Sequence, residues 1–425
     1  PQGTLVRGSR ESEAPDSASM SPCTNMNYFA TGGRPFLLQF PPCISHISFC
    51  LKEKIIEAET IDLHCSAADS EETVSSRDVR FTSPKTKNPK PPAALHEAFR
   101  PEDVQPWKEG QFEDVEKVQD AVRNHGQVHV MRDADNGRFV CVKKMPNHWV
   151  QKSHKDFVRN FPFETEQPWQ DIGCNNFLST NGYEHGCRLL GVYRNQEHTA
   201  VVTELASEGD LFSWCGTPTT AAPGPEREAL LRPLALQIVE GVRDLHQMAI
   251  VHRDLSLENL VMSKGDSQDL KVRVIDFGMS STARYFRSCV TGKPSYQAPE
   301  LYVEDNYDAF LTDAFAIGVS LYAAFVKDYP WLATKPGGCK CFEFYKKNGF
   351  RKYIGKRKLR GYGGMVVADI MSEPLVRLLE GLLACNPEER LTLGESPWEG
   401  TSRRSVFDEA WLFETDALEG QEPKV

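Results

Sequence analysis

The sequence predicts an α+β protein in which a small antiparallel sheet lobe with one main helix precedes a large helical lobe. In the strand-rich part, Asn136-Gly137 separates two strand-like runs, and Asn-Gly is the strongest short hairpin signal. The apolar run from Ala314 to Val326 predicts a buried core helix, because it is too short to span a bilayer. A helical pattern begins after Pro225, where apolar residues recur at spacings of one, three and four: Leu230, Leu231, Leu234, Ile238, Val242 and Leu245.

The individual elements follow from the same patterns. Pro168 suits the first turn of a helix, which Thr165 or Glu166 is expected to cap. Alternating apolar residues bounded by turn residues predict strands over 127–131, 138–145, 188–193, 200–205 and 271–275.

Composition bounds the class of protein. The chain has 425 residues, 40% of them hydrophobic, with a formal net charge of -10. This acidic excess disfavours nucleic acid and anionic membranes as partners, and no apolar run predicts a membrane span or signal peptide. The twelve cysteines form no Cys-x-x-Cys pair, which is typical of reduced thiols in a cytosolic protein, so we expect a cytoplasmic or nuclear location.

The expected organisation has three parts. Residues 1–108 show no sustained period and contain stretches rich in Ser, Thr, Lys and Pro, so we predict a disordered or unassigned extension. A folded domain over 109–395 follows, with a first lobe at about 109–204 and a second at about 209–395. Residues 396–425 are expected to be a tail. Because the chain begins at Pro1 rather than Met, we expect a fragment or an inexact gene model.

The stretch with the most chemical information is His252-Arg253-Asp254-Leu255, followed by Asn259. It resembles the catalytic loop of protein kinases, His-Arg-Asp-Leu-x-x-x-Asn. Phosphoryl transfer needs a carboxylate that orients the attacking hydroxyl and oxygen ligands for Mg²⁺. A single match of this length is also compatible with an ordinary surface loop.

Four further motifs stand in the order and at the spacing of the same family. The resemblance covers about residues 112–393, and it implies a two-lobed protein-kinase fold that binds ATP and Mg²⁺ and phosphorylates Ser or Thr of a protein substrate. The motifs are Asp276-Phe277-Gly278, Gln297-Ala298-Pro299-Glu300, Asp313-Ala314-Phe315-Ala316-Ile317-Gly318 and Asn386-Pro387-Glu388-Glu389-Arg390.

The resemblance implies roles for single residues. Asp254 would accept the proton of the substrate hydroxyl, Asn259 and Asp276 would bind Mg²⁺, and Lys143 would contact the α- and β-phosphates. The other residues that would surround the nucleotide are Gly126, Val128, Cys141, Asp171, Thr203, Glu204, Ala206, Asp210 and Val261. Of these, Thr203 would be the gatekeeper, and the three apolar residues Val128, Cys141 and Val261 suit generic core equally well.

The phosphate loop departs from the family pattern. Gly126 matches the third glycine of Gly-x-Gly-x-x-Gly, but Ala121 and Arg123 replace the first two. Glycine lets backbone amides approach phosphate, so the grip on the nucleotide should weaken, although Arg123 returns some attraction. Two carboxylates are candidate partners of Lys143, namely Asp171 in the middle of the predicted helix and Glu166 at its start.

Two further positions depart from the pattern. Ser256 stands where serine/threonine kinases carry Lys, and Lys293 stands where they carry Thr. We expect Lys293 to supply the missing charge beside Asp254. By the same resemblance, residues 276–300 form the activation segment. Cys289 occupies its usual phosphate-acceptor position for Arg253, so the acceptor would be another residue of this segment: Thr282, Ser288 or Thr291.

Two other functions fit part of the pattern. A pseudokinase that acts as an ATP- or protein-binding scaffold is consistent with the altered phosphate loop, whereas the four retained polar groups favour activity. A small-molecule phosphotransferase is disfavoured by Glu300 and Arg390, which belong to a protein-substrate site. Nine Lys and Arg residues lie within 340–360, where they form either a solvated face or a surface for acidic substrates.

Overall fold

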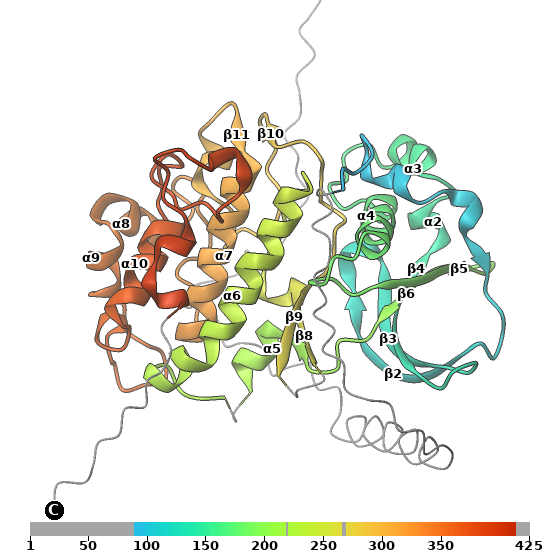
Figure 1. Cartoon of the computed structure of the whole chain (residues 1–425), viewed down its shortest axis with the longest axis horizontal. Coiled ribbons are helices and arrows are strands. Elements are labelled where there is room, and N and C mark those ends of the chain that lie inside the picture. The colour runs from blue at the N-terminus through green and yellow to red at the C-terminus, as the bar shows by residue number, and fades with distance from the viewer. Residues whose placement is uncertain (1–88, 218–219, 266–268, 414–425) are drawn as a thin grey trace, which may run out of the picture. The chain divides into compact units, whose positions relative to one another are not determined.

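The computed structural model describes residues 89–217, 220–265 and 269–413 (Figure 1). All of them lie within one compact unit of the chain. They form a sheet lobe with a single main helix, followed by a helical lobe, as the sequence predicts.

The first lobe is built on a six-stranded sheet with the strand order β1-β5-β6-β4-β3-β2. All neighbouring strands are antiparallel except β1 and β5. The predicted hairpin is confirmed, and its register places Val128 opposite Lys143 and therefore on the same face of the sheet. The strands are β1 (Gln105–Pro106), β2 (Phe112–Ala121), β3 (Gly126–Asp133), β4 (Phe139–Pro146), β5 (Leu189–Arg194) and β6 (His198–Glu204).

The main helix of this lobe is α4 (Pro168–Thr180), and it begins at Pro168 as predicted. The predicted cap is wrong, because the residue at the N-cap is Gln167, whose side chain makes no capping bond. The Glu166 side chain is used elsewhere and accepts a hydrogen bond from Asn124. Two short helices, α2 (Asn147–Val150) and α3 (His154–Asn160), precede α4.

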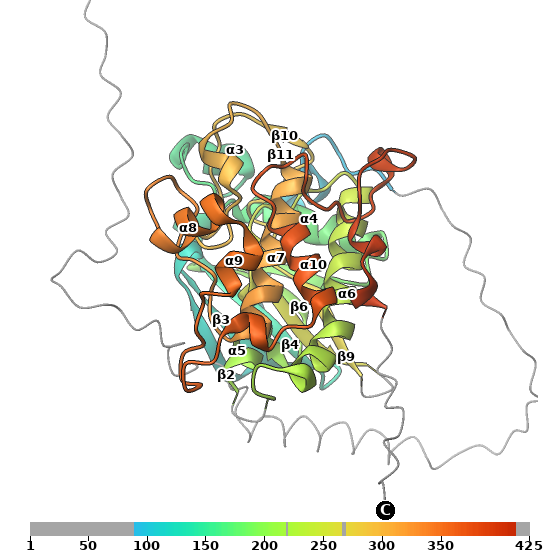
Figure 2. The same ribbon diagram turned by 90° about the vertical axis from the view of Figure 1, so that its left-hand side faces the viewer.

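The second lobe is built around α7 (Ala309–Val326), every residue of which is buried. This helix is long and apolar enough to cross a membrane, and it lies entirely inside the protein. α6 (Pro225–Gln247) and α10 (Glu373–Leu382) pack beside it (Figures 1 and 2). Leu230 is 47% exposed, contrary to the predicted apolar face, because α6 turns only its neighbour Leu231 toward the core.

The remaining elements position the loops of the site. The predicted strand over 271–275 is confirmed as β9 (Leu270–Val274), which pairs with β8 (Leu260–Lys264). The others are β7 (Gly209–Asp210), α5 (Leu211–Gly216), β10 (Tyr285–Phe286), β11 (Tyr307–Asp308), α8 (Lys340–Asn348) and α9 (Phe350–Ile354).

The packed region extends beyond the expected domain limits of 109 and 395. Residues 1–88 lie outside the described residues, but within 89–108 Leu95 is fully buried, while the rest of that stretch is half-buried or exposed. At the other end, Trp411 is 1% exposed and donates a hydrogen bond to Glu228 of α6 at 2.7 Å. The expected extension and the expected tail therefore both contribute to the core.

Candidate functional site

The loop that carries Asp254 is held in place by a buried carboxylate, that of Asp313. Asp313 of α7 accepts hydrogen bonds from the backbone N–H groups of His252, at 2.8 Å, and Arg253, at 2.9 Å. Arg253 has a φ of 68°, a left-handed conformation that is uncommon for a side chain other than Gly. These bonds offset the cost of that conformation and fix the loop beneath the cleft.

Asp254 and Asn259 form one unit. The amide Nδ2 of Asn259 donates to the Asp254 carbonyl at 2.8 Å and to its Oδ2 at 3.3 Å. Asp254 is 2% exposed, and its Oδ1 has no hydrogen-bond partner among the described residues. A buried carboxylate oxygen without a partner is costly unless a ligand uses it, which makes it a candidate acceptor for a substrate proton.

Lys143 joins the two lobes. Its Nζ lies 3.2 Å from Asp171 Oδ2 in α4 and 3.2 Å from Asp276 Oδ1 in the second lobe. Burial alone would lower the pKa of Lys143, but the charges of Asp171, Asp276 and Glu166 outweigh it and raise that pKa above its ordinary value. Burial alone would raise the pKa of Asp276, but Lys143 and Arg123 lower it to about 2. Both groups are therefore charged at neutral pH.

The two candidate partners of Lys143 have different contacts. Asp171 bonds Lys143 and also accepts a hydrogen bond from the Phe277 backbone at 3.0 Å. Glu166 instead receives bonds from Asn124, at 2.9 Å, and Arg123, at 3.4 Å. The structure therefore pairs Lys143 with Asp171 and links Glu166 to the phosphate loop.

The phosphate loop reaches into the site through Arg123. Its Nη1 lies 2.8 Å from Asp254 Oδ2, although 131 residues separate the two in sequence. Burial, followed by the charge of Asp276, raises the pKa of Glu166 to about 8 despite the neighbouring cations.

The glycine at position 126 is needed for a steric reason. A Cβ there would lie 2.1 Å from the Lys144 carbonyl oxygen.

The predicted nucleotide residues come from strands of both lobes and from the segment between them. Cys141 pairs with Thr203, and Val128 lies on the same sheet face as Lys143. Val261 pairs with Asp210 at the start of the second lobe. The carboxylate of Asp210 accepts the Ser213 N–H at 2.7 Å and so caps α5. Glu204 ends β6, and Ala206 follows it, half-buried.

The exchanged pair Ser256 and Lys293 are in contact. Lys293 Nζ donates to Ser256 Oγ at 2.6 Å and pairs with Glu258 at 3.2 Å. Among the described residues, Lys293 makes no hydrogen bond or ion pair with Asp254, so the expected direct contact is absent. The lysine instead links the catalytic loop to the segment that contains Gly292.

The activation segment is tied to the second lobe at two points. Arg390 Nη2 donates to Glu300 Oε2 at 2.9 Å, and both side chains are buried. Arg253 Nη2 contacts Cys289 Sγ at 3.0 Å, and its guanidinium lies over the Phe286 ring. Arg253 therefore faces the position where a phosphate acceptor was expected.

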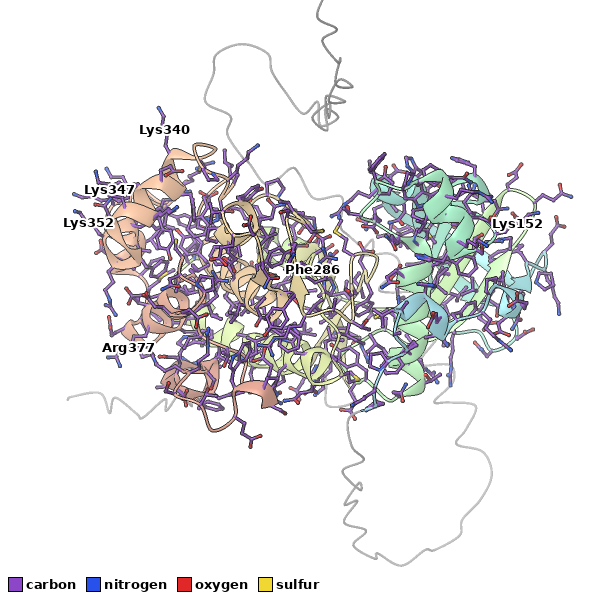
Figure 3. All side chains as sticks on the ribbon, turned by 90° about the horizontal axis from the view of Figure 1, so that it is seen from above. Lys152, Phe286, Lys340, Lys347, Lys352 and Arg377 are labelled. Atoms are coloured by element: carbon purple, nitrogen blue, oxygen red, sulfur yellow. The ribbon has the colours of Figure 1, made fainter. Side chains whose placement is uncertain are left out.

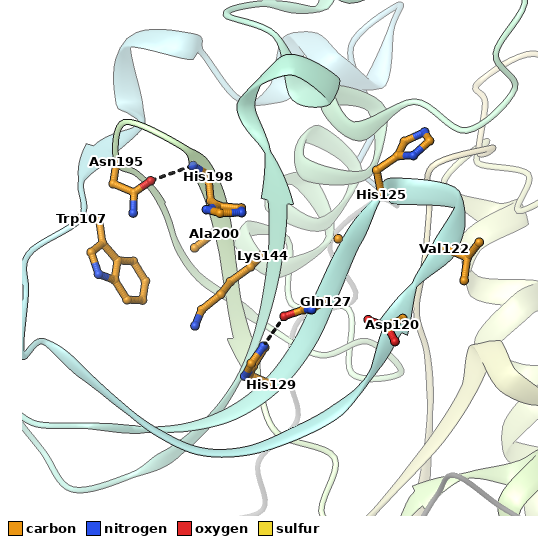
Figure 4. Close-up of a pocket in the computed structure, with 11 residues that line it drawn as sticks. Trp107, Asp120, Val122, His125, Gln127, His129, Lys144, Asn195, His198 and Ala200 are labelled. Atoms are coloured by element: carbon orange, nitrogen blue, oxygen red, sulfur yellow. Dashed lines mark hydrogen bonds between the residues drawn. The ribbon is translucent and has the colours of Figure 1, made fainter.

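Two other surface features lie outside this site. A cavity of about 590 Å³ lies on the opposite face of the sheet from Lys143, lined by Lys144, His129 and Trp107 among others (Figure 4). Lys340, Lys347 and Lys352 point away from the helical lobe (Figure 3), whereas arginines of the same basic stretch pair with Asp328, Glu373 and Glu380. Whether this stretch binds acidic substrates stays a prediction.

The residues present fit Mg²⁺ and ATP. Asp276 is an ionised carboxylate, and Asn259 is oriented through its amide nitrogen by Asp254, so both offer the oxygen ligands that Mg²⁺ prefers. Lys143 is a charged donor for phosphate oxygens on the cleft face of β4.

Comparisons with known proteins agree with this geometry. Residues 124–398, well over half of the chain, match the family model described as protein kinase domain. The chain is similar to serine/threonine-protein kinase SRK2C of Arabidopsis thaliana, with 33% identity over 210 residues, 49% of this chain and 56% of the relative. It is also similar to serine/threonine-protein kinase SAPK5 of Oryza sativa subsp. japonica, with 32% identity over 214 residues, 50% of this chain and 54% of the relative. The chain thus spans little more than half the length of these relatives.

Proposed function

Because the chain belongs to the protein kinase family, we propose that it transfers the γ-phosphoryl group of ATP to a serine or threonine hydroxyl of a protein substrate. Its relatives are named serine/threonine-protein kinases, which supports serine or threonine rather than tyrosine as the acceptor residue.

One observation carries the proposal, namely the convergence of five charged or polar groups from both lobes. Asp254 and Asn259 are joined by hydrogen bonds, and Lys143 bridges Asp171 and Asp276. The free Oδ1 of Asp254 would accept the proton of the attacking hydroxyl, while Lys143 would hold the phosphates. Bound Mg²⁺, held by Asn259 and Asp276, would neutralise the charge that develops on the phosphates.

The test is transfer of radiolabelled phosphate from ATP to a generic basic protein, followed by identification of the labelled amino acid. Asp254→Asn keeps the size of the side chain but removes the base, so we expect transfer to fall at least about 100-fold, the lower end of general-base contributions. Label on serine or threonine that disappears in the variant supports the proposal. Nucleotide binding without transfer in the parent chain would favour a scaffold instead.

A further inference from the structure

A segment outside the predicted domain packs directly on the helix that carries Asp171. We call residues 93–107 the N-terminal segment. Its Leu95 is fully buried in the main hydrophobic core, which also includes Cys174, Phe177 and Leu178 of α4, and the turn Leu95–Ala98 packs against that helix. A core contact of this kind orders both partners.

The contact with α4 is close enough to require a glycine in the helix. A Cβ on Gly173 would lie 2.1 Å from the Leu95 carbonyl oxygen and 2.8 Å from the His96 Cα. One turn further on, Asn176 Nδ2 donates to the Ala98 carbonyl at 2.7 Å. At Gly173 the backbone of the N-terminal segment therefore lies against the backbone of α4 with no side chain between them.

The same segment is anchored on both sides of this contact. Toward its start, Thr282 of the activation segment donates from Oγ1 to the Ala93 carbonyl at 2.8 Å. Toward its end, β1 adds an edge strand to β5, and the Trp107 N–H donates to the Arg194 carbonyl at 2.9 Å. It thus connects the activation segment, α4 and the sheet.

The opposite side of α4 faces the catalytic groups. Asp171 bonds Lys143 at 3.2 Å and the Phe277 N–H at 3.0 Å, and Gln170 Nε2 donates to the Ser280 carbonyl at 3.0 Å. A shift of α4 by about one ångström would break these bonds, because hydrogen bonds weaken steeply with distance and angle. Contacts that hold the face of α4 opposite Asp171 therefore also hold Asp171 in position.

We propose that the N-terminal segment positions the catalytic site by holding α4 where Asp171 meets Lys143. The positioning residues are Leu95 of the segment and Gly173 of α4. The inference rests on the proposed kinase activity for its functional consequence. Its structural consequence, a change in the order of α4, does not depend on that activity.

A merely structural role makes a different prediction. If Leu95 were only a general core residue, its substitution would lower the stability of the whole protein. The exchange of amide hydrogens would then rise in α4 and in α7 alike. A positioning role confines the effect to α4 and lowers kcat, while the KM for ATP changes less, because the cleft residues remain in place.

The experiment uses the full chain with Leu95→Ser and measures amide exchange and transfer rates. We expect exchange in α4 to accelerate at least about tenfold with α7 unchanged, and kcat to fall at least about tenfold. Leu95→Met, which keeps a large apolar side chain, should leave both the exchange in α4 and kcat close to the values of the parent chain. Phe163→Ser is the matched control, since Phe163 is 90% exposed near the start of α4, and it should change neither.

Gly173→Ala tests the same contact from the helix side. Alanine favours a helix more than glycine does, so faster exchange in α4 would come from the clash with the Leu95 carbonyl rather than from helix propensity. Exchange in α4 within twofold of the parent for both variants would overturn the proposal, as would equal acceleration in α7. If the parent chain transfers no phosphate, the proposed function fails, while the exchange measurements still decide the positioning role.

Discussion

The catalytic loop of the second lobe and the phosphate loop of the first lobe face the same cleft but are built differently. The catalytic loop keeps His252, Asp254 and Asn259 of the family pattern and is fixed by buried bonds to Asp313. The phosphate loop has lost two glycines, and its Arg123 instead bonds the catalytic Asp254 across the cleft. The two regions are therefore joined through Arg123, a side-chain cation at a position where the family pattern has glycine.

The largest expected effect comes from removing the cation that joins the two lobes, Lys143. Lys143→Met deletes the charge that bonds Asp171 and Asp276, so we expect kcat to fall by about 100- to 1,000-fold. Initial transfer rates measure it. Lys144→Met is the matched control, because Lys144 lies on the other face of the strand beside the cavity of Figure 4, and its rate should stay within about threefold. Equal loss in both variants would contradict this assignment.

The second prediction concerns the stability of the catalytic side of the comparison. Arg390→Met leaves the Glu300 carboxylate buried without its partner, so we expect the free energy of unfolding to fall by about 3–5 kcal/mol. Denaturant titration measures the change. Adding Glu300→Gln should recover part of the loss, because the uncompensated charge is removed. A loss below about 1 kcal/mol would place this pair among ordinary surface ion pairs.

The third prediction is a dependence of stability on pH. Burial would lower the pKa of His246, but the hydrogen bonds that its ring donates to Asp313 and Glu395 raise it to about 9. The folded state therefore holds a proton that the unfolded state, with a pKa near 6.5, releases. The contribution is complete below about pH 6.5 and is lost as pH rises toward 9, on the order of 3 kcal/mol in total.

Unfolding titrations at several pH values check this, with His246→Gln as the variant that cannot take a proton. The parent should lose more stability than the variant between pH 6.5 and 9. Parallel pH curves for the two proteins would contradict the charged state of His246.

The two regions also differ in how far the sequence predicts them. The second lobe follows from local motifs, because each of them lies within a few consecutive residues. The bond from Arg123 to Asp254 joins residues 131 positions apart, and nothing near Arg123 in the sequence points to it. Pairing of Lys143 with Asp171 rather than Glu166 likewise depends on how α4 lies against the sheet.

The contributions of the two chain ends escape the sequence patterns for a related reason. Leu95 lies in a helical turn of four residues and Trp411 in one of three, too short for a period of 2 or 3.6 to be visible. Gly173 is a local clue to some close neighbour of α4, because a glycine inside a helix usually has a packing reason, but the sequence does not say which segment approaches it.

The roles of Arg123 and Asp254 are tested most directly by the transfer rate as a function of ATP concentration, measured for the parent, Arg123→Gly and Asp254→Asn. If the phosphate loop only grips the nucleotide, Arg123→Gly should raise the KM for ATP about tenfold, the worth of one charge-assisted hydrogen bond, with kcat within about threefold. Asp254→Asn should lower kcat with little change in KM. A fall in KM for Arg123→Gly would show that the arginine blocks the site, and unchanged kcat in Asp254→Asn would contradict the central assignment.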